Sequence, residues 1–396
     1  MSKRKAIPKE MRLRVYEKCN HRCAYCGCEL DYKDMQVDHM KSVYVNADFK
    51  QIMSEEEMNS YENLLPSCRQ CNFYKSTMSL EKFRERLRGT MMDNLRKNFG
   101  YRLAIKYGLI EEHNGEPVKF YFEQMKEKQM EEVIRRAETA EKHTAEMEKL
   151  YSDYIRKSAE ETKEYGPDTS TAWNDKIVKT KIILKDQDSV SAVFEYSKEK
   201  TALLNFASYR YPGGMFLEGE IAQEEYLCHA SNLYNVLVKK QEFYDWNSMN
   251  LNRSLYVNRA LYSPKILFFK GNKEKECDVI TCAAPNKTAA KMYQRVSDQE
   301  NFDVLRTRIK FMLNIAQDNK VVNLILGAFG CGVFGQDAEE VAKIFMEELI
   351  KGTTIKQVIF AIPKGENYDK FKKIMLEQKR NLGENSKSNE RIVITC

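Results

Sequence analysis

The chain has 396 residues, a mass of 46.4 kDa and a hydrophobic content of 42%, with 22 Tyr and 19 Phe. This length predicts two domains and a connector, and the composition excludes a chain that lacks a packed core. Because no apolar run reaches the roughly 18 residues of a membrane span and the start MSKRKAIPKE lacks the apolar centre of a signal peptide, we expect a cytoplasmic protein without a membrane partner.

The net charge of +6 is concentrated at the start of the chain. Residues 1–110 hold 21 Lys and Arg against 14 Asp and Glu, a net charge of +7, and the remainder holds 43 against 44. This distribution predicts a polyanionic partner for the N-terminal part alone. Six of the 11 cysteines also lie before residue 72, and clustered cysteines in a reducing compartment indicate a metal site rather than disulfides.

Two Cys-x-x-Cys pairs frame the N-terminal part of the chain, Cys23 with Cys26 and Cys68 with Cys71. Four thiolates complete a tetrahedral site with no position open to water, which predicts a structural Zn²⁺ ion. A small module with little core would depend on such an ion for its folding. A buried, unligated thiol is the alternative for a single cysteine such as Cys19, and the presence of two pairs argues against it.

Between the pairs, the run MQVDHM has the character of a short strand and ends in Asp38-His39. The chain then passes through ENLLPS at 62–67 to CNFYKS at 71–76, which predicts the start of a helix that carries Leu80, Phe83 and Leu87. This order of motifs over residues 12–88 resembles the HNH endonucleases. The resemblance implies a small zinc-bound ββα-metal module that cleaves DNA.

By that resemblance, His39 is the general base and Asn63 orients its imidazole, while Asp38 and Asn72 bind Mg²⁺ or another divalent cation. Asn72 stands where the family often has a histidine, and its amide oxygen suits a hard cation. A lone histidine more often has a structural role. His39, however, lies in the sequence between the two Cys-x-x-Cys pairs, which favours a catalytic role. Nearby basic residues could contact DNA phosphates or form a solvated helix face. They are Arg12, Arg14, Lys75, Lys82, Arg84, Arg86, Arg88, Arg96 and Lys97.

The segment at 120–165 is rich in Glu and Lys and contains no Gly or Pro. Its apolar residues recur at helical spacing, first at 130–137 and then at 147–155, which predicts charged helices with a break near His143. Because no heptad persists, we expect the apolar stripe to pack against the following domain rather than to form a coiled coil. The predicted domains are therefore 1–95 for the zinc module, 96–125 for a connector and 126–396 for a second domain with a helical lead-in.

The second domain alternates predicted strands with predicted helices, which is typical of a largely parallel or mixed sheet covered on both faces. Strands are predicted at 177–184, 192–196, 201–206, 266–269, 278–282, 321–326 and 358–362, and helices at 224–239, 302–316 and 338–350. Ligands of such sheets bind beyond the carboxyl ends of the strands. Glycine-rich turns follow two of these strands, at 213–214 and at 327–335.

In the first turn, Gly213 and Gly214 let backbone N–H groups approach an anion closely, and Gln223, Glu224 and Glu225 open the next helix. The alternative is a purely structural role for both acids, since a negative charge in the first turn of a helix interacts favourably with the helix dipole. The second turn, GAFGCGVFG, places N–H donors ahead of a helix N-terminus and suits a diphosphate. A glycine-rich loop can also serve tight packing alone.

The glycine turn followed by Gln-Glu-Glu, with its flanks at 205–207 and 227–228 and DVITCAAPN at 278–286, resembles the microbial poly(ADP-ribose) glycohydrolases over residues 137–371. The resemblance implies a three-layer α/β/α macrodomain that hydrolyses a glycosidic bond of ADP-ribose without a metal. Glu225 would protonate the leaving oxygen and Glu224 would hold ribose hydroxyls. Met215 stands at the family's third glycine and places a side chain at the phosphate-facing turn. By the same resemblance, Phe334 would pack on a ribose. The implied ADP-ribose contacts are Gly213, Gly214, Gln223, Gly327, Gly330, Gly332, Phe334 and Gly335.

These patterns together predict a multidomain α/β enzyme in which an HNH endonuclease acting on DNA is joined by charged helices to an ADP-ribose glycohydrolase-like macrodomain. Defence against phage is one expected role, and control of ADP-ribosylated DNA or protein is another. One alternative is a sensor in which Met215 blocks turnover and an ADP-ribose-derived signal gates the nuclease. A second alternative is a DNA-binding scaffold with an inactive nuclease. The sequence leaves the DNA target and the oligomeric state open.

Overall fold

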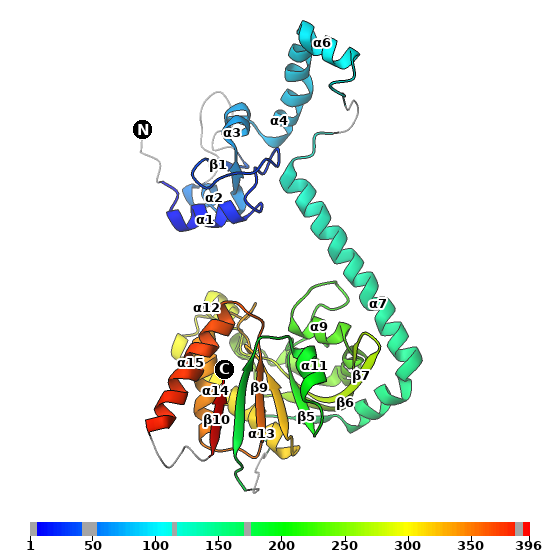
Figure 1. The fold of residues 1–396 in the computed structure, drawn as a ribbon, viewed down its shortest axis with the longest axis vertical. Helices are drawn as coiled ribbons and strands as arrows, with labels where there is room; N and C mark the ends of the chain where they lie inside the picture. Colours follow the sequence, from blue (N-terminus) through cyan, green and yellow to red (C-terminus); the bar gives the residue numbers. More distant parts are fainter. Residues whose placement is uncertain (1–5, 42–53, 113–116, 170–175, 385–390) are drawn as a thin grey trace. The chain divides into compact units, whose positions relative to one another are not determined.

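The computed structural model describes residues 6–41, 54–112, 117–169, 176–384 and 391–396. The chain divides into two compact units, Met1–Glu132 and Val133–Cys396. The helix α7 (Tyr121–Glu161) contains the boundary between them (Figure 1). No helix in the described ranges combines the length and the apolar content that crossing a membrane requires.

The first unit contains a short antiparallel pair of strands and the helix that follows it. β1 (Gln36–His39) pairs with β2 (Leu64–Ser67), and α3 (Arg69–Lys75) begins two residues after β2. The buried core of this unit includes Val15, Met35 and Phe83. The remaining helical segments are α1 (Lys9–Glu17), α2 (Glu55–Met58), η1 (Tyr61–Asn63), α4 (Leu80–Arg86), η2 (Leu87–Met91), α5 (Met92–Lys97) and α6 (Phe99–Lys106).

The helix predicted to start near Cys71 and to carry Leu80 is in fact two helices. α3 ends at Lys75 because Ser76 adopts a φ of +50°, which lies outside the helical region. Ser79 then caps α4, since its Oγ accepts a hydrogen bond from the N–H of Lys82 at 3.3 Å. The apolar spacing continues across the break, so periodicity alone could not separate the two helices.

The segment predicted as a connector, 96–125, ends inside the core of the first unit. Phe120 and Phe122 are both buried there, and the ring of Phe120 lies 5.2 Å from that of Tyr25. The N–H groups of Tyr121 and Phe122 donate to the carbonyls of Tyr25 and Ala24 at 3.0 and 2.8 Å. The start of α7 is therefore fixed to the loop that carries Cys23 and Cys26.

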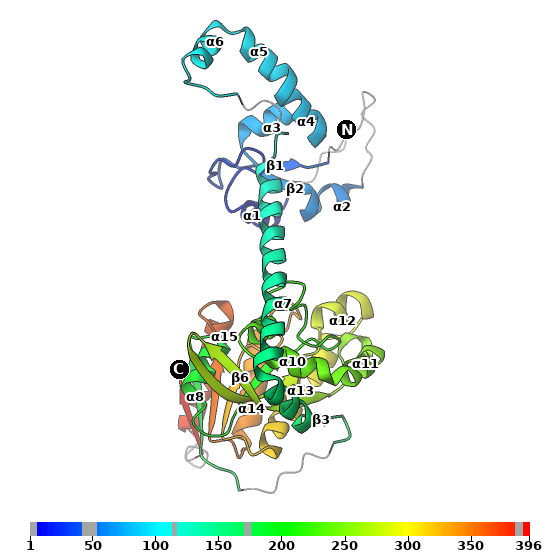
Figure 2. The ribbon, with the colours of Figure 1, turned by 90° about the vertical axis from the view of Figure 1, so that its right-hand side faces the viewer.

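α7 has one interruption, and it lies at Tyr151 (φ −126°, ψ 24°) rather than near His143 as predicted. His143 stays helical, and its Nε2 lies 2.8 Å from the carbonyl oxygen of Ser231. Of the predicted apolar stripe, Met147 and Ile155 are buried in the second unit, whereas Leu150 is 59% exposed. The apolar stripe was predicted to pack against the second domain, and part of it does so. Figure 2 shows α7 beside α10 (Leu233–Leu237), where Nδ2 of Asn235 donates to the carbonyl of Thr144 at 3.0 Å.

The described strands of the second unit form one mixed sheet in the order β10-β4-β9-β8-β5-β7-β6-β3. The strands from β10 to β7 in this order are parallel, and β6 and β3 join the edge in antiparallel pairing. Their bounds are Lys163–Tyr165 (β3), Thr180–Lys185 (β4), Thr201–Phe206 (β5), Ala260–Lys270 (β6), Lys273–Cys282 (β7), Asn323–Leu326 (β8), Gln357–Ala361 (β9) and Ile392–Thr395 (β10).

Helices cover both faces of this sheet. They are α8 (Ser189–Tyr196), α9 (Gln223–His229), α10, α11 (Gln241–Met249), α12 (Lys287–Gln294), α13 (Asp298–Asp318), α14 (Ala338–Ile350) and α15 (Glu366–Glu384), with the short turns η3 (Val238–Lys240) and η4 (Asn252–Ser254). Leu204 packs in the apolar cluster of α13 and α14, whereas its neighbour Leu203 packs in the cluster of α7 and α9, because successive strand residues point to opposite faces. Figure 1 shows α14 and α15 on one side of the strands and α9 and α11 on the other. The arrangement is a three-layer α/β/α domain.

The prediction of a strand at 192–196 was wrong, since these residues belong to α8. Asp188 caps this helix, and its Oδ1 accepts from the N–H of Ser191 at 2.8 Å. The strand propensity of Val193, Phe194 and Tyr196 suggested a strand, but Val193 is buried against the sheet on the same face of the helix as Val190. A capping signal thus prevailed over strand propensity.

The single helix predicted at 224–239 is divided into α9, α10 and η3. The division falls at Ser231, which is buried and forms an isolated bridge with Phe268 of β6. The carbonyl of Leu267 accepts from the N–H of Asn232 at 3.2 Å, so the chain bonds to the sheet edge between the two helices. By contrast, the strand predicted at 201–206 and the helix predicted at 338–350 are confirmed as β5 and α14.

Candidate functional site

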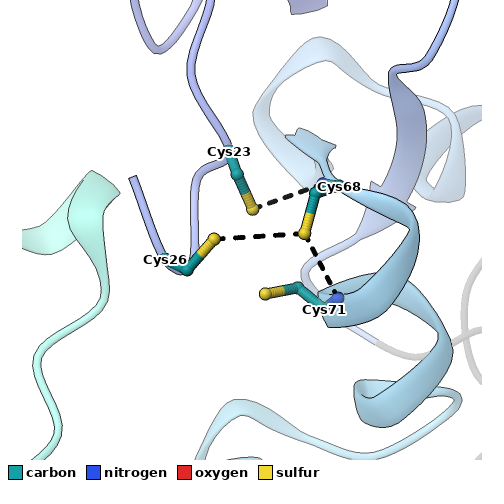
Figure 3. A group of neighbouring side chains, drawn as sticks. All are labelled: Cys23, Cys26, Cys68 and Cys71. Carbon is teal, nitrogen blue, oxygen red and sulfur yellow. Dashed lines mark hydrogen bonds between the residues drawn. The ribbon is translucent and has the colours of Figure 1, made fainter. Parts of the chain in front are cut away.

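In the first unit, the four cysteines of the two Cys-x-x-Cys pairs converge as predicted (Figure 3). Their Sγ atoms all lie within 4.8 Å of one another, and those of Cys26 and Cys68 are 3.9 Å apart. Four sulfurs at the Zn–S distance of about 2.3 Å from a tetrahedral ion would be separated by about 3.8 Å. The group therefore fits a tetrahedral metal ion such as zinc.

Local backbone structure positions these sulfurs. Gly27, with φ of +73°, lets the first pair turn back on itself, and its N–H donates to the carbonyl of Cys23 at 2.9 Å. Cys68 is the N-cap of α3, and its Sγ accepts from the N–H of Cys71 at 3.4 Å. The N–H of Cys68 in turn donates to Sγ of Cys23 at 3.3 Å. These backbone hydrogen bonds fix the positions of the Cys23 and Cys68 sulfurs within the group.

The hydrogen bonds of the Asn63 side chain differ from the predicted contact with the His39 imidazole. His39 ends β1, and its Nε2 lies 3.2 Å from Oδ1 of Asn59. Asn63 instead ties the residues after β1 to the end of α2, because its Oδ1 accepts from the N–H of Lys41 at 2.8 Å and its Nδ2 donates to the carbonyl of Met58 at 2.9 Å. The side chain that contacts the imidazole is therefore Asn59, and no motif in the sequence pointed to it.

The Asp38 carboxylate, predicted to bind a divalent cation, is neutralised inside the unit. Its Oδ2 lies 2.9 Å from Nζ of Lys75, a residue that is only 1% exposed, and also accepts a hydrogen bond from the Tyr25 hydroxyl. Among the described residues, no group of three His, Cys, Asp or Glu ligands other than the cysteine group converges. Protein groups thus engage the Asp38 carboxylate in this structure, and the cation site predicted for Asp38 and Asn72 stays a prediction.

Two of the basic residues predicted to face DNA are engaged within the unit instead. Lys75 holds Asp38 and donates to the carbonyl of His39 at 2.9 Å. Arg84 donates to the Glu123 carboxylate and, through Nε, to the carbonyl of Val118 at 3.1 Å. Lys82, Arg86 and Arg88 are the exposed members of the same stretch.

In the second unit, a cavity of about 1230 Å³ lies at the carboxyl ends of β5, β8 and β9, which are neighbours in the sheet. Its walls come mainly from the segments that follow these three strands and from the start of α9, with Asp188, Tyr256 and Ala284 from other segments. Glu224 and Glu225 line it together with Gly214 and Met215. The cavity thus occupies the place where sheets of this kind bind ligands.

The turn beside the two acids requires glycine for two reasons. Gly213 and Gly214 have φ values of +70° and +63°, which other residues adopt at a cost. A Cβ atom on Gly214 would lie 2.3 Å from Oε1 of Glu225 and 3.1 Å from Oε2 of Glu224. A Cβ atom on Gly213 would lie 2.6 Å from the ring of Tyr234. The absence of these side chains makes room for both carboxylates at the cavity wall.

The two carboxylates are buried, and each is held by specific donors. Glu225 accepts from the N–H of Met215 at 2.9 Å and from that of Ala222 at 3.0 Å. Glu224 accepts from Nδ2 of Asn205 at 2.9 Å and from the N–H of Ser208 at 2.5 Å. Burial raises the pKa of Glu224 to about 8, and the neighbouring Glu225 charge acts in the same direction. Glu225 therefore caps α9, as first-turn acids do, and also lines the cavity.

The predicted ADP-ribose contacts divide into two groups. Gly214, Gln223, Gly330, Gly332 and Phe334 line the cavity. The other three do not line the cavity, and glycine is required there because a Cβ atom would be too close to a neighbouring side chain. They are Gly213, Gly327 and Gly335. A Cβ atom would lie 2.9 Å from the Phe206 ring at Gly327 and 2.2 Å from Oγ1 of Thr288 at Gly335.

Gln223 faces the cavity but its amide is used to join two elements. Its Oε1 accepts from the N–H of Phe206 at 2.8 Å, and its Nε2 donates to the carbonyl of Leu204 at 2.9 Å. These bonds fix the first turn of α9 to the carboxyl end of β5. The positions of Glu224 and Glu225 relative to the sheet follow from this connection.

Residues 128–271 match the family described as "Microbial-type PARG, catalytic domain", where PARG is poly(ADP-ribose) glycohydrolase. The second unit carries a PARG-like domain. The solved PARG of Thermomonospora curvata bound to the inhibitor ADP-HPD is 27% identical, with a TM-score of 0.54 over 60% of this chain and 98% of that chain. The PARG of Deinococcus radiodurans in complex with ADP-ribose is 26% identical, with a TM-score of 0.52 over 57% of this chain and 97% of that chain.

The chain is also similar to the Septu protein PtuB of Bacillus thuringiensis. The two are 36% identical over 76 residues. The match covers 18% of this chain and spans about a quarter, 26%, of the length of the Septu protein.

Met215 does not disturb the glycine turn of the PARG-like domain. It is not among the residues with positive φ, so the backbone at this position tolerates a side chain. Its N–H, which every residue except proline carries, donates to Glu225, while its side chain is 44% exposed and lines the cavity. The substitution therefore preserves the contact to Glu225 and changes the shape of the cavity wall.

Two residues that hold the first of the paired acids were not predicted. Asn205 at the end of β5 donates to Glu224 through its side chain, and Ser208 donates through its backbone. Tyr256, which also lines the cavity, lies with its ring 6.0 Å from that of Phe334. An Asn at the carboxyl end of a buried strand is a signal for the first of these contacts.

Proposed function

We propose that the PARG-like domain binds ADP-ribose units and hydrolyses the glycosidic bond by which they are attached. The observation that carries this proposal is the placement of Glu224 and Glu225 in one cavity with the glycine-rich loop after β8. N–H groups of that loop suit a diphosphate, and a pair of buried carboxylates suits glycoside hydrolysis. The similarity to solved PARG structures supports the same activity.

In the proposed reaction, Glu225 donates a proton to the oxygen of the leaving group as the bond between that oxygen and the anomeric carbon of the ribose breaks. Both bonding electrons leave with the oxygen, and the ribose becomes an oxocarbenium-like ion. Water then adds to the anomeric carbon and gives up a proton to Glu225, which restores the acid. Glu224 holds the ribose hydroxyls. Phe334, which lines the cavity beside Tyr256, packs on a ribose.

Calorimetry with free ADP-ribose, run beside an assay for release of ADP-ribose from an ADP-ribosylated protein, tests this function. We expect both binding and release by the wild-type protein. Binding without release would favour the sensor alternative, in which the Met215 side chain leaves no room for productive attack. Absence of binding would contradict the proposal.

We propose as a second function that the first unit is an HNH-type endonuclease acting on DNA. The order β1, β2 and α3, the convergent cysteine group and the position of His39 at the end of β1 favour it. His39 would accept a proton from the attacking water. Because Lys75 occupies the Asp38 carboxylate, no step is assigned to a cation on that residue.

We expect His39→Ala to reduce nicking of plasmid DNA by at least about 100-fold, which is the lower range for loss of a general base. The assay uses the full chain in a buffer that contains Mg²⁺. His21→Ala is the matched control, because His21 is an exposed residue of the same unit that pairs with Glu17. Equal nicking by wild type and His39→Ala would leave the first unit as a DNA-binding scaffold.

We further propose that the two functions act together in defence against phage, with the similarity to the Septu protein in support. ADP-ribose, or a group derived from it, would then change the activity of the nuclease. The plasmid assay repeated with and without ADP-ribose tests this coupling. Unchanged cleavage and unchanged DNA binding would contradict it.

A further inference from the structure

The described residues that line the cavity of the PARG-like domain carry more acids than bases. The carboxylates are Asp188, Glu220, Glu224, Glu225 and Glu366, and the cations are Arg210 and Lys364. A diphosphate would bring further negative charge into this acidic site. Both cations are exposed to solvent, and backbone N–H groups supply only partial charges. A dianionic ligand would therefore gain from a further positive charge that is shielded from solvent.

Arg308 of α13 provides such a charge. Its side chain is fully buried, at 0% exposure, and its donors contact neutral acceptors. Nε donates to Oδ1 of Asn258 at 2.6 Å, Nη1 donates to the carbonyl of Ala283, and Nη2 donates to the carbonyl of Leu255 at 3.3 Å. In the described part of the chain, no carboxylate forms an ion pair with it. A guanidinium stays protonated even when buried, so the charge is present and unpaired.

The guanidinium lies directly behind the cavity wall. The two carbonyls that it holds belong to Ala283 and Leu255, and the next residues, Ala284 and Tyr256, line the cavity. Ala284 in turn contacts the glycine-rich loop, since a Cβ atom on Gly330 would lie 2.7 Å from its Cβ. One layer of residues therefore separates the charge from the loop proposed to bind the diphosphate.

We propose that Arg308 makes this cavity selective for ligands that carry a diphosphate, by placing an uncompensated positive charge behind the phosphate-binding loop. An unpaired buried charge destabilises the folded protein, and attraction to a bound dianion offsets this cost in the complex. The interaction passes through protein rather than solvent, so salt screens it little. This inference rests on the proposed binding of ADP-ribose.

The test compares the affinities for ADP-ribose and for uncharged adenosine by calorimetry. Across one layer of residues and with an effective dielectric constant of about 20, loss of the charge should weaken ADP-ribose binding by about 10- to 100-fold. We expect this loss in Arg308→Met and Arg308→Gln, with adenosine binding changed by less than about threefold. Arg308→Lys, which retains the charge, should retain the preference for ADP-ribose.

Two neutral variants are included because Arg308→Met leaves two carbonyls without donors, whereas Arg308→Gln supplies amide donors to them. Thermal unfolding of each variant establishes that it is folded. Arg306→Met is the matched control, since Arg306 lies on the same helix and pairs with Glu347 at its surface. If the neutral variants weakened both ligands equally, or neither, the inference would be overturned. Wild-type protein that fails to bind ADP-ribose would instead contradict the proposed function, and the inference with it.

Discussion

Glu225→Gln should abolish release of ADP-ribose while leaving its binding largely intact. Glutamine has the shape of glutamic acid but cannot donate a proton to the leaving oxygen, and loss of a general acid lowers a rate by roughly 100- to 10,000-fold. Binding should persist, because the glycine-rich loop, Phe334 and Glu224 are unchanged. A fall in kcat without a matching rise in KM, measured as initial rates over a range of substrate concentrations, is the expected result.

The variant also has a structural cost that must be separated from its chemical effect. Both oxygens of Glu225 accept backbone N–H groups, from Met215 and Ala222. In glutamine one of these acceptors becomes an amide nitrogen, so one N–H loses its partner and stability falls by about 1–3 kcal/mol. Thermal unfolding reports this cost, and calorimetry with ADP-ribose shows whether the cavity keeps its shape.

Glu218→Gln is the matched control for Glu225→Gln. Glu218 lies in the same loop, is exposed and does not line the cavity. It should release ADP-ribose at the rate of the wild-type protein. Retained release by Glu225→Gln would assign the proton transfer to another group, and the nearest candidate is Glu224, whose pKa is raised to about 8 by burial.

The parts of both sites that short motifs determine could be predicted from the sequence. Two Cys-x-x-Cys pairs bring four sulfurs together, because each pair forms its own turn and the strands between them are short. In the same way, a Gly-Gly turn ahead of paired acids fixes its own backbone, since positive φ and the space beside the carboxylates both require glycine. Local geometry explains both successes.

Contacts between distant segments could not be predicted. Nothing near Asp38 in the sequence indicates that Lys75 will neutralise it, or that Asn59 rather than Asn63 will contact His39. Arg308 likewise holds carbonyls that lie 25 and 53 residues away along the chain. Such contacts depend on how elements pack, and a motif describes only the residues within it.

The prediction of secondary structure was wrong where a local signal opposed the average propensity of the residues. In α8, an N-cap at Asp188 and one buried face outweighed the β-branched and aromatic residues that suggested a strand. Between α9 and α10, the bridge of Ser231 to β6 interrupts a pattern that periodicity reads as one helix. The first of these differences lies beside the cavity, since Asp188 forms part of the wall.

Removal of metal from the cysteine group should unfold the first unit and leave the second unit intact. The group fits a tetrahedral zinc ion, and structural zinc in small domains contributes about 10–16 kcal/mol to folding. The core of the first unit depends on the same turns, because Ala24 and Tyr25, between Cys23 and Cys26, accept backbone hydrogen bonds from Phe122 and Tyr121. Loss of the ion should therefore release the start of α7 as well.

Metal content measured on the purified full chain, followed by thermal unfolding and limited proteolysis with and without a chelator, tests this expectation. We expect bound zinc, loss of one unfolding transition on chelation, and new cleavage sites before residue 133 only. Cys68→Ser should behave like the chelated protein, because Cys68 is both a ligand and the N-cap of α3. Cys28→Ser is the control, since Cys28 is an exposed cysteine of the same unit outside the group. ADP-ribose binding should be equal in all four samples, because the second unit has its own core. Two unchanged transitions after complete removal of the metal would show that the first unit folds on its apolar core alone.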